Sequence, residues 1–176
     1  MIANRRAGSW PLQTDKPALA PWLAVALGVC GLDQATKFAA SAGLEYGVPH
    51  PLLPSFNLTL LHNTGAAFSM LHDAAGWQRW FFSAIALVVA IGLGWWLTRM
   101  DRSDRFEVCA LVLILGGAVG NLLDRVRLGY VVDFIQLYYQ QYSFPAFNIA
   151  DSAISVGAFM LLLRSAGMGP RVPLPR

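Results

Sequence analysis

No charged side chain interrupts WFFSAIALVVAIGLGWWL, the 18 residues from Trp80 to Leu97, which lie between Arg79 and Arg99. A transmembrane helix needs about 17–25 predominantly apolar residues to cross a hydrocarbon layer about 30 Å thick. This stretch meets that length. The sequence therefore predicts a membrane-spanning helix over residues 77–99.

Three further apolar stretches predict three more spans. The uncharged run 108–123 predicts a span over residues 106–124. Residues 21–42 and 147–165 are also apolar apart from a few ionisable side chains, and beside two clear spans they are interpreted as spans that carry functional charge. The predicted fold class is an all-α membrane protein with four transmembrane helices, in one domain over residues 21–165.

Composition and charge placement agree with a membrane protein. Hydrophobic residues make up 56% of the 176-residue chain and charged residues 13%, whereas soluble domains carry about 25% charged residues. A free-standing soluble domain and a disordered chain are therefore excluded. Basic residues gather on one side of the spans, which the positive-inside rule assigns to the cytoplasm. Nine of the 13 lie there: Arg5, Arg6, Lys16, Arg99, Arg102, Arg105, Arg164, Arg171 and Arg176.

This orientation places both termini in the cytoplasm, as tails over residues 1–20 and 166–176. Segments 43–76 and 125–146 then lie in the periplasm, and the first of them contains no Lys or Arg. The net charge of +3 is explained by the topology, so we expect no nucleic-acid partner.

The two periplasmic segments carry signals for β-structure. Residues 56–60 alternate apolar and polar side chains, which is typical of a half-buried strand. Asn63-Thr64-Gly65 then predicts a turn. In the second segment, residues 130–135 form a run of β-prone side chains.

The ionisable residues within or near the membrane all fall at its outer side. Burying one charge in a bilayer costs at least about 2.5–3.5 kcal/mol, so a group at one depth indicates a functional site. Simpler interpretations exist for single residues, such as an i,i+4 ion pair or a helix N-cap formed by Asn148. The group consists of Asp33, Lys37, Asp124, Arg125, Asp133 and Asp151.

Two carboxylates at this boundary suggest acid–base hydrolysis. If Asp133 and Asp151 approach closely, both cannot ionise easily, and the pair shares one proton. The ionised member can take a proton from water, while the protonated member polarises the substrate carbonyl. Arg125 could limit the local negative charge, and the amides of Asn63 and Asn148 could orient the substrate.

Other chemistries have less support. The cysteines lie toward the inner side and the histidines outside, so a thiol–imidazole pair is improbable. No histidine spacing matches a zinc signature. Lys37 and Ser41 could mimic a serine–lysine dyad, but Asp33 would hold Lys37 protonated, which is wrong for a general base.

Four motifs resemble those of lipoprotein signal peptidases (signal peptidase II). They are Asp33-Gln-Ala-Thr-Lys37, Asn63-Thr-Gly-Ala-Ala-Phe68-Ser69, Gly120-Asn-Leu-Leu-Asp-Arg125 with its continuation to Ile135, and Phe147-Asn-Ile-Ala-Asp-Ser152. They occur in the family's order, and the resemblance covers about residues 20–165. Thr36 and Leu123 replace residues common in the family and keep the chemistry.

The resemblance implies a bacterial inner-membrane aspartyl endopeptidase that cleaves prolipoproteins before a diacylglyceryl-modified Cys. It implies Asp133 and Asp151 as the catalytic pair, without metal or cofactor. Globomycin-type inhibitors would bind, and the periplasmic segments would form a small β cradle and a mobile arm that acts as a lid over the site. Residues implied to line or support the site are Asn63, Asn121, Asp124, Arg125 and Asn148, with Asp33 and Lys37 as structural supports.

Two rival functions remain open at this stage. A small proton-coupled transporter would also place acids in the membrane, although it predicts acids in the inner halves of the spans, which carry none here. A membrane scaffold predicts that the acids are dispensable. For the peptidase, we expect a monomer whose partners are a diacylated prolipoprotein and membrane lipid.

Overall fold

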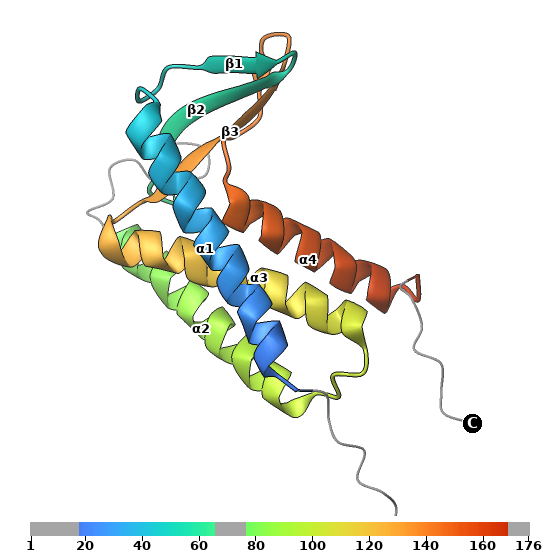
Figure 1. Cartoon of the computed structure of the whole chain (residues 1–176). Coiled ribbons are helices and arrows are strands. Elements are labelled where there is room, and N and C mark those ends of the chain that lie inside the picture. The colour runs from blue at the N-terminus through green and yellow to red at the C-terminus, as the bar shows by residue number, and fades with distance from the viewer. Residues whose placement is uncertain (1–17, 66–76, 169–176) are drawn as a thin grey trace, which may run out of the picture.

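The computed structural model describes residues 18–65 and 77–168, and within them it contains the four predicted helices. They are α1 (Ala20–Gly43), α2 (Trp77–Arg99), α3 (Arg105–Arg127) and α4 (Ile149–Ser165). Figure 1 shows α3 at the centre of the bundle, where it packs against the other three helices. α4 begins two residues later than predicted, because Asn148 is its N-cap and not its first turn.

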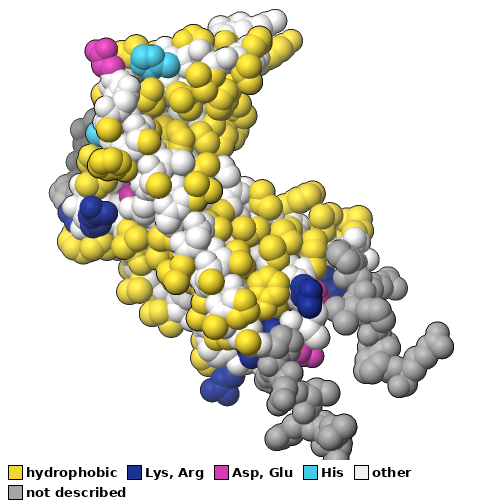
Figure 2. All heavy atoms as spheres, viewed as in Figure 1, with side chains coloured by type: hydrophobic (Ala, Val, Ile, Leu, Met, Phe, Trp, Pro, Cys, Tyr) yellow, Lys and Arg dark blue, Asp and Glu magenta, His cyan; other side chains and the backbone are white. Residues whose placement is uncertain are grey.

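Three of the described helices, α1, α2 and α3, are long and apolar enough to cross a membrane. α4 has 17 residues, so the fourth span stays a prediction. Large apolar side chains point outward from the bundle, such as Phe38 (77% exposed) and Val88 (69% exposed), and Figure 2 shows apolar atoms over most of the helical surface. Such a surface is stable against lipid tails, because they are as apolar as the side chains.

Glycines in α3 allow its neighbours to approach closely, as small residues commonly do between membrane helices. A Cβ on Gly117 would lie 2.5 Å from the carbonyl oxygen of Ala150 in α4. A Cβ on Gly120 would lie 2.6 Å from a carboxylate oxygen of Asp33 in α1. A larger side chain at either position would push apart the helices that carry the ionisable residues.

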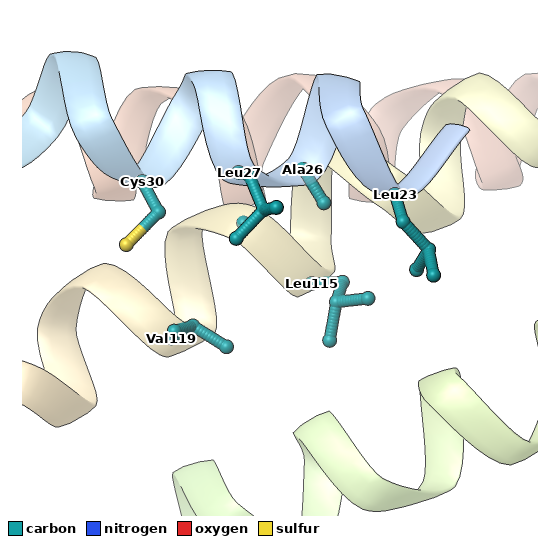
Figure 3. A pocket seen from close by; sticks show the side chains of 7 residues that line it. Leu23, Ala26, Leu27, Cys30, Leu115 and Val119 are labelled. Atoms are coloured by element: carbon teal, nitrogen blue, oxygen red, sulfur yellow. The ribbon is translucent and has the colours of Figure 1, made fainter. Parts of the chain in front are cut away.

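An apolar groove opens between α1 and α3, with a volume of about 220 Å³. Figure 3 shows side chains from both helices pointing into it. They include Leu23, Leu27 and Cys30 from α1 and Leu115 and Val119 from α3. The groove is lined almost entirely by apolar side chains, and Cys30 at one end of it lies one turn before Asp33 in α1.

The connections between α1 and α2 and between α3 and α4, which the sequence predicts to be periplasmic, contribute a four-stranded antiparallel sheet in the order β1-β2-β3-β4. Its strands are β1 (His50–Leu53), β2 (Phe56–Asn63), β3 (Val131–Tyr139) and β4 (Tyr142–Ser143). Figure 1 shows it at the end of the bundle where α1 ends and α4 begins. The strands expected at residues 56–60 and 130–135 are confirmed.

The register of β2 against β3 positions the end of β2. Leu61 pairs with Asp133 and Asn63 with Val131, while the pairing shifts between Leu58 and Leu61. Such a bulge interrupts the alternation of faces, and Thr59 and Leu60 are therefore both buried, contrary to simple alternation. The expected turn at Asn63 is present as a bend, in which the Gly65 N–H donates to Asn63 Oδ1 at 2.8 Å.

Some predicted features lie outside the described residues. These are the second half of the motif that begins at Asn63, part of segment 43–76, and most of both tails.

Candidate active site

Asp133 lies in β3, and its side chain is almost fully buried, with 2% of the residue exposed. Two asparagine amides donate to it. Asn148 Nδ2 donates to Oδ1 at 2.7 Å, and Asn63 Nδ2 donates to Oδ2 at 3.0 Å. Both oxygens therefore accept a hydrogen bond, which fixes the plane of the carboxyl group.

Asp151 lies in the first turn of α4, where Asn148 is the N-cap. The Asn148 Oδ1 accepts from the backbone N–H of Asp151 at 2.9 Å. Asn121 Nδ2, from α3, donates to Asp151 Oδ1 at 2.7 Å. The Asn121 amide therefore fixes one oxygen of the Asp151 carboxyl group against α3.

Asn148 connects the two aspartates directly. Its amide nitrogen binds the Asp133 carboxyl, and its amide oxygen binds the Asp151 backbone. The capping bond fixes which end of the amide faces Asp133, because an amide has one accepting oxygen and one donating nitrogen. The N-cap interpretation is thus confirmed, and the same residue also places a donor on the neighbouring carboxyl.

Burial and the nearby negative charge of Asp151 raise the pKa of Asp133 from 3.8 to about 6. The hydrogen bonds from Asn63 and Asn148 and the charge of Lys37 act in the opposite direction and lower this pKa. Burial is the larger cause, as expected for a carboxyl group with almost no contact with water. A carboxyl group with this pKa can hold a proton near neutral pH and release it.

Lys37 forms the centre of a buried ionic cluster, which we define as Asp33, Lys37 and Asp124. The Lys37 Nζ lies 2.8 Å from Asp33 Oδ2 and 2.9 Å from Asp124 Oδ2, and it donates to Asn121 Oδ1 at 2.8 Å. These three acceptors match the three protons of an ammonium group. The i,i+4 pair is confirmed, and Lys37 is held as a cation and cannot serve Ser41 as a base.

The ionic cluster also holds the chain next to each aspartate of the pair. Asp33 Oδ1 accepts from the backbone N–H of Ala150 at 2.8 Å, one residue before Asp151. Asp124 Oδ2 accepts from the backbone N–H of Val132 at 3.1 Å, one residue before Asp133. The buried cluster therefore sets the position of both aspartates through their preceding peptide groups.

Arg125 lies half-buried in the last turn of α3, at the end of the bundle that carries the two aspartates. Its guanidinium carbon lies 5.6 Å from the centre of the Phe82 ring, and Nη1 donates to the Asn121 carbonyl oxygen at 3.4 Å. It interacts electrostatically with Asp151, Asp133 and Asp124, with Asp151 contributing most. A cation here offsets part of the negative charge of the pair.

Gln34 is a supporting residue to which the sequence analysis assigned no role. Its Nε2 donates to Asp124 Oδ1 at 2.9 Å and to the Gly120 carbonyl oxygen at 3.2 Å. The signal was present in the sequence, because Gln34 lies three residues before Lys37 and so shares a helix face with it. The sequence did not indicate that α3 packs against that face of α1.

The chain is similar to known proteins along most of its length. The family model for signal peptidase II matches residues 25–166. A lipoprotein signal peptidase of Acinetobacter baumannii is 56% identical over 142 residues, which is 81% of each chain. One from Teredinibacter turnerae is 53% identical, over 80% of this chain and 84% of the relative. A solved bacterial membrane enzyme has a TM-score of 0.74 and 30% identity, over 91% of this chain and 98% of its own.

Proposed function

This chain belongs to the signal peptidase II family, and from that membership we propose how its aspartates perform the reaction. It is a membrane peptidase that removes the signal peptide from lipoprotein precursors. Nothing in the comparisons supports the transporter alternative. The proposal concerns the aspartic type of catalysis, the residues that carry it, the substrate's lipid and the orientation in the membrane.

We propose that Asp133 and Asp151 form an aspartic dyad that shares one proton. The observation that carries this is the position of Asn148, which binds the Asp133 carboxyl and the Asp151 backbone at the same time. Among the described residues, no group donates a hydrogen bond to Asp151 Oδ2. That oxygen can therefore face a water molecule and the shared proton.

In the proposed reaction, ionised Asp151 accepts a proton from water, and the water oxygen attacks the scissile carbonyl carbon. Protonated Asp133 donates its proton to the carbonyl oxygen, which gives a neutral tetrahedral diol. Collapse of the diol breaks the C–N bond. Asp151 gives its proton to the leaving amine, and Asp133 recovers a proton from a diol hydroxyl, so the dyad returns to its starting state.

The raised pKa of Asp133 supports its assignment as the acid. A carboxyl group with a pKa of about 6 is still partly protonated near neutral pH. The amide of Asn121 supports Asp151 as the base. Its oxygen is held by Lys37 Nζ, so its NH₂ group is the end that faces Asp151. A donor that cannot rotate away stabilises the ionised carboxylate.

The substrate we propose is a diacylglyceryl-modified prolipoprotein, cleaved before its lipidated Cys. The dyad lies where the helices meet the sheet, and a lipid-modified Cys would be held at this depth by its acyl chains. We further propose four spans in the inner membrane with both termini cytoplasmic and the dyad at the periplasmic face. The distribution of basic residues supports this orientation.

The test uses purified protein and a diacylated prolipoprotein, with the unacylated form as a second substrate. We expect cleavage of the diacylated form by the wild type, and none by Asp133→Asn or Asp151→Asn. Cleavage that survived both substitutions would disprove the dyad. Equal cleavage of the unacylated form would instead disprove the requirement for lipid and leave the dyad in place.

A further inference from the structure

A second, basic groove lies at the end of the bundle opposite the dyad. It has a volume of about 580 Å³ and is formed by the start of α1 and the connection between α2 and α3. Figure 2 shows dark blue basic side chains beside apolar ones at this end of the molecule. Its lining includes Pro21, Trp22 and Val25 from α1, and Arg102, Ser103 and Arg105 from the connection and α3.

The groove has arginine side chains on one side and apolar side chains on the other. Arg102 is held in place, because Nη1 donates to the Leu97 carbonyl oxygen at 3.0 Å near the end of α2. Arg105 is the first residue of α3 and is exposed, so the amino end of that helix adds positive potential. On the other side, Trp22 packs against the buried core, which gives a rigid apolar surface.

Two acids near the groove have partners of their own among the described residues. Asp104 pairs with Arg164, and its Oδ1 caps α3 by accepting from the Glu107 N–H at 3.2 Å. Asp101 Oδ1 accepts from the Ser103 N–H at 3.0 Å. Within the described residues, the lining contains two arginines and no acidic side chain.

The groove lies at the membrane boundary on the cytoplasmic side of the proposed topology. From Arg105 to Asp124, α3 advances 19 residues, or about 28 Å at 1.5 Å per residue. This is close to the thickness of the hydrocarbon layer, about 30 Å. With the dyad at the outer headgroups, the two arginines therefore lie at the inner headgroups.

We propose that this basic groove binds the phosphate of an anionic glycerophospholipid from the cytoplasmic leaflet. The phosphate lies between Arg102 and Arg105, and an acyl chain follows α1 past Trp22 and Val25. Basic pockets between helices on the cytoplasmic side bind anionic headgroups in this way. The inference rests on the proposed orientation and on no property of the dyad.

The test is native mass spectrometry of the full-length protein in a neutral detergent, titrated with phosphatidylglycerol, with phosphatidylcholine, or with inorganic phosphate. We expect phosphatidylglycerol to bind more tightly than phosphatidylcholine, and inorganic phosphate not to displace it. Arg105→Gln should weaken phosphatidylglycerol binding about fivefold, the attraction of one arginine to an anionic surface. Peptidase activity in neutral detergent should stay at the wild-type level and show that the variant is folded.

The matched control is Arg99→Gln. Arg99 lies at the same end of the molecule, with its guanidinium 5.7 Å from the centre of the Trp95 ring, and it does not line the groove. Both substitutions remove one positive charge, and we expect Arg99→Gln to change binding less than twofold. Equal losses in the two variants would mean diffuse attraction and overturn the proposal. Equal binding of the two lipids, or displacement by inorganic phosphate, would also overturn it.

Discussion

Two pairs of aspartates lie at the end of the bundle next to the sheet, and they differ in the groups that bind their carboxylates. Asp33 and Asp124 both contact the Lys37 ammonium group, at 2.8 and 2.9 Å. Among the described residues, the side chains of Asp133 and Asp151 are instead hydrogen-bonded by neutral asparagine amides. All four residues are aspartates at the same end of the bundle, so the difference lies in the charge of the donor.

That difference separates a structural role from a chemical one. A buried carboxylate that contacts a cation keeps its negative charge, and removing one partner leaves an uncompensated charge. A carboxyl group that receives only neutral donors beside a second carboxyl group is held near the point of protonation. The first pair therefore fixes the geometry, and the second pair can exchange a proton during the reaction.

The largest expected effect is on the catalytic rate, and it follows substitution in the pair bound by neutral amides, Asp133 and Asp151. Asp151→Asn should lower kcat at least about 10³-fold, because it removes the general base. Ser152→Ala is the matched control in the same helical turn. The Ser152 hydroxyl donates to the Asn148 backbone carbonyl oxygen at 2.9 Å and not to either aspartate, so kcat should stay within about threefold of wild type. Single-turnover cleavage measures both. Similar losses in the two variants would show general sensitivity of this turn.

The second effect is on the free energy of unfolding. Here a substitution in the ionic cluster should have the larger effect, and a substitution at Asp133 the smaller one. Lys37→Met should destabilise the fold by about 3–5 kcal/mol, because it leaves two buried carboxylates without their cation. Asp133→Asn should stay within about 1 kcal/mol of wild type. Because the pKa of Asp133 is higher in the folded state, ionisation of this residue lowers the stability of the fold as the pH rises through about 6. Asn at this position does not ionise, so this loss of stability disappears, while one amide contact is weakened.

Unfolding in mixed detergent micelles at neutral pH measures this contrast. A Lys37→Met variant as stable as the wild type would contradict the structural role of the ionic cluster. Strong destabilisation by Asp133→Asn would show that this residue also serves mainly to hold the fold together.

The sequence predicted α2 and α3 from long uncharged runs, and α1 and α4 from apolar stretches with a few ionisable side chains, because a helix in lipid must be predominantly apolar. It also predicted local pairs, namely Asp33 with Lys37 and the cap at Asn148, because helical spacing alone determines them. The bulge in β2 was not predictable from residues 56–60, since the shift arises from pairing with β3.

Contacts between helices were beyond the reach of sequence patterns. Lys37 reaches Asp124 and Asn121 only because Gly120 allows α1 to lie against α3. The spacing placed Asp124 and Asn121 on one face of α3, but nothing in it oriented that face toward α1. The motif resemblance implied that Asp124 and Asn121 belong to the site. The structure shows how they are held there, through their contacts with Lys37.

The third effect concerns Asn121, a positioning residue that connects the two pairs. Its oxygen accepts from Lys37 Nζ, and its nitrogen donates to Asp151 Oδ1. Asn121→Ala should lower kcat about 10–100-fold, because a small misplacement of a catalytic group can cost about 100-fold in rate, with little change in KM. Steady-state kinetics separate the two constants. A rise in KM with unchanged kcat would indicate a role in substrate binding instead.

The smallest effect is a shift in the pH dependence of kcat/KM, which tests the assignment of Asp133 as the general acid. If protonated Asp133 is required, kcat/KM should fall as the pH rises above an apparent pKa of about 6 in the free enzyme. The hydrogen bond from Asn63 lowers this pKa because it favours the ionised carboxylate. Asn63→Ala should therefore move the alkaline limb to higher pH, even though the maximal rate falls.

Thr59→Val provides the control for this shift, since Thr59 lies in the same strand and its hydroxyl donates to Gln136 Oε1 at 2.8 Å, with no contact to the dyad. Its alkaline limb should stay at the wild-type pH, because no hydrogen bond to Asp133 is lost. A limb that stayed fixed in Asn63→Ala would mean that Asn63 only shapes the end of β2. A limb that moved equally in both variants would attribute the shift to the sheet as a whole. Only a shift confined to Asn63→Ala identifies Asp133 as the carboxyl group whose proton limits the reaction.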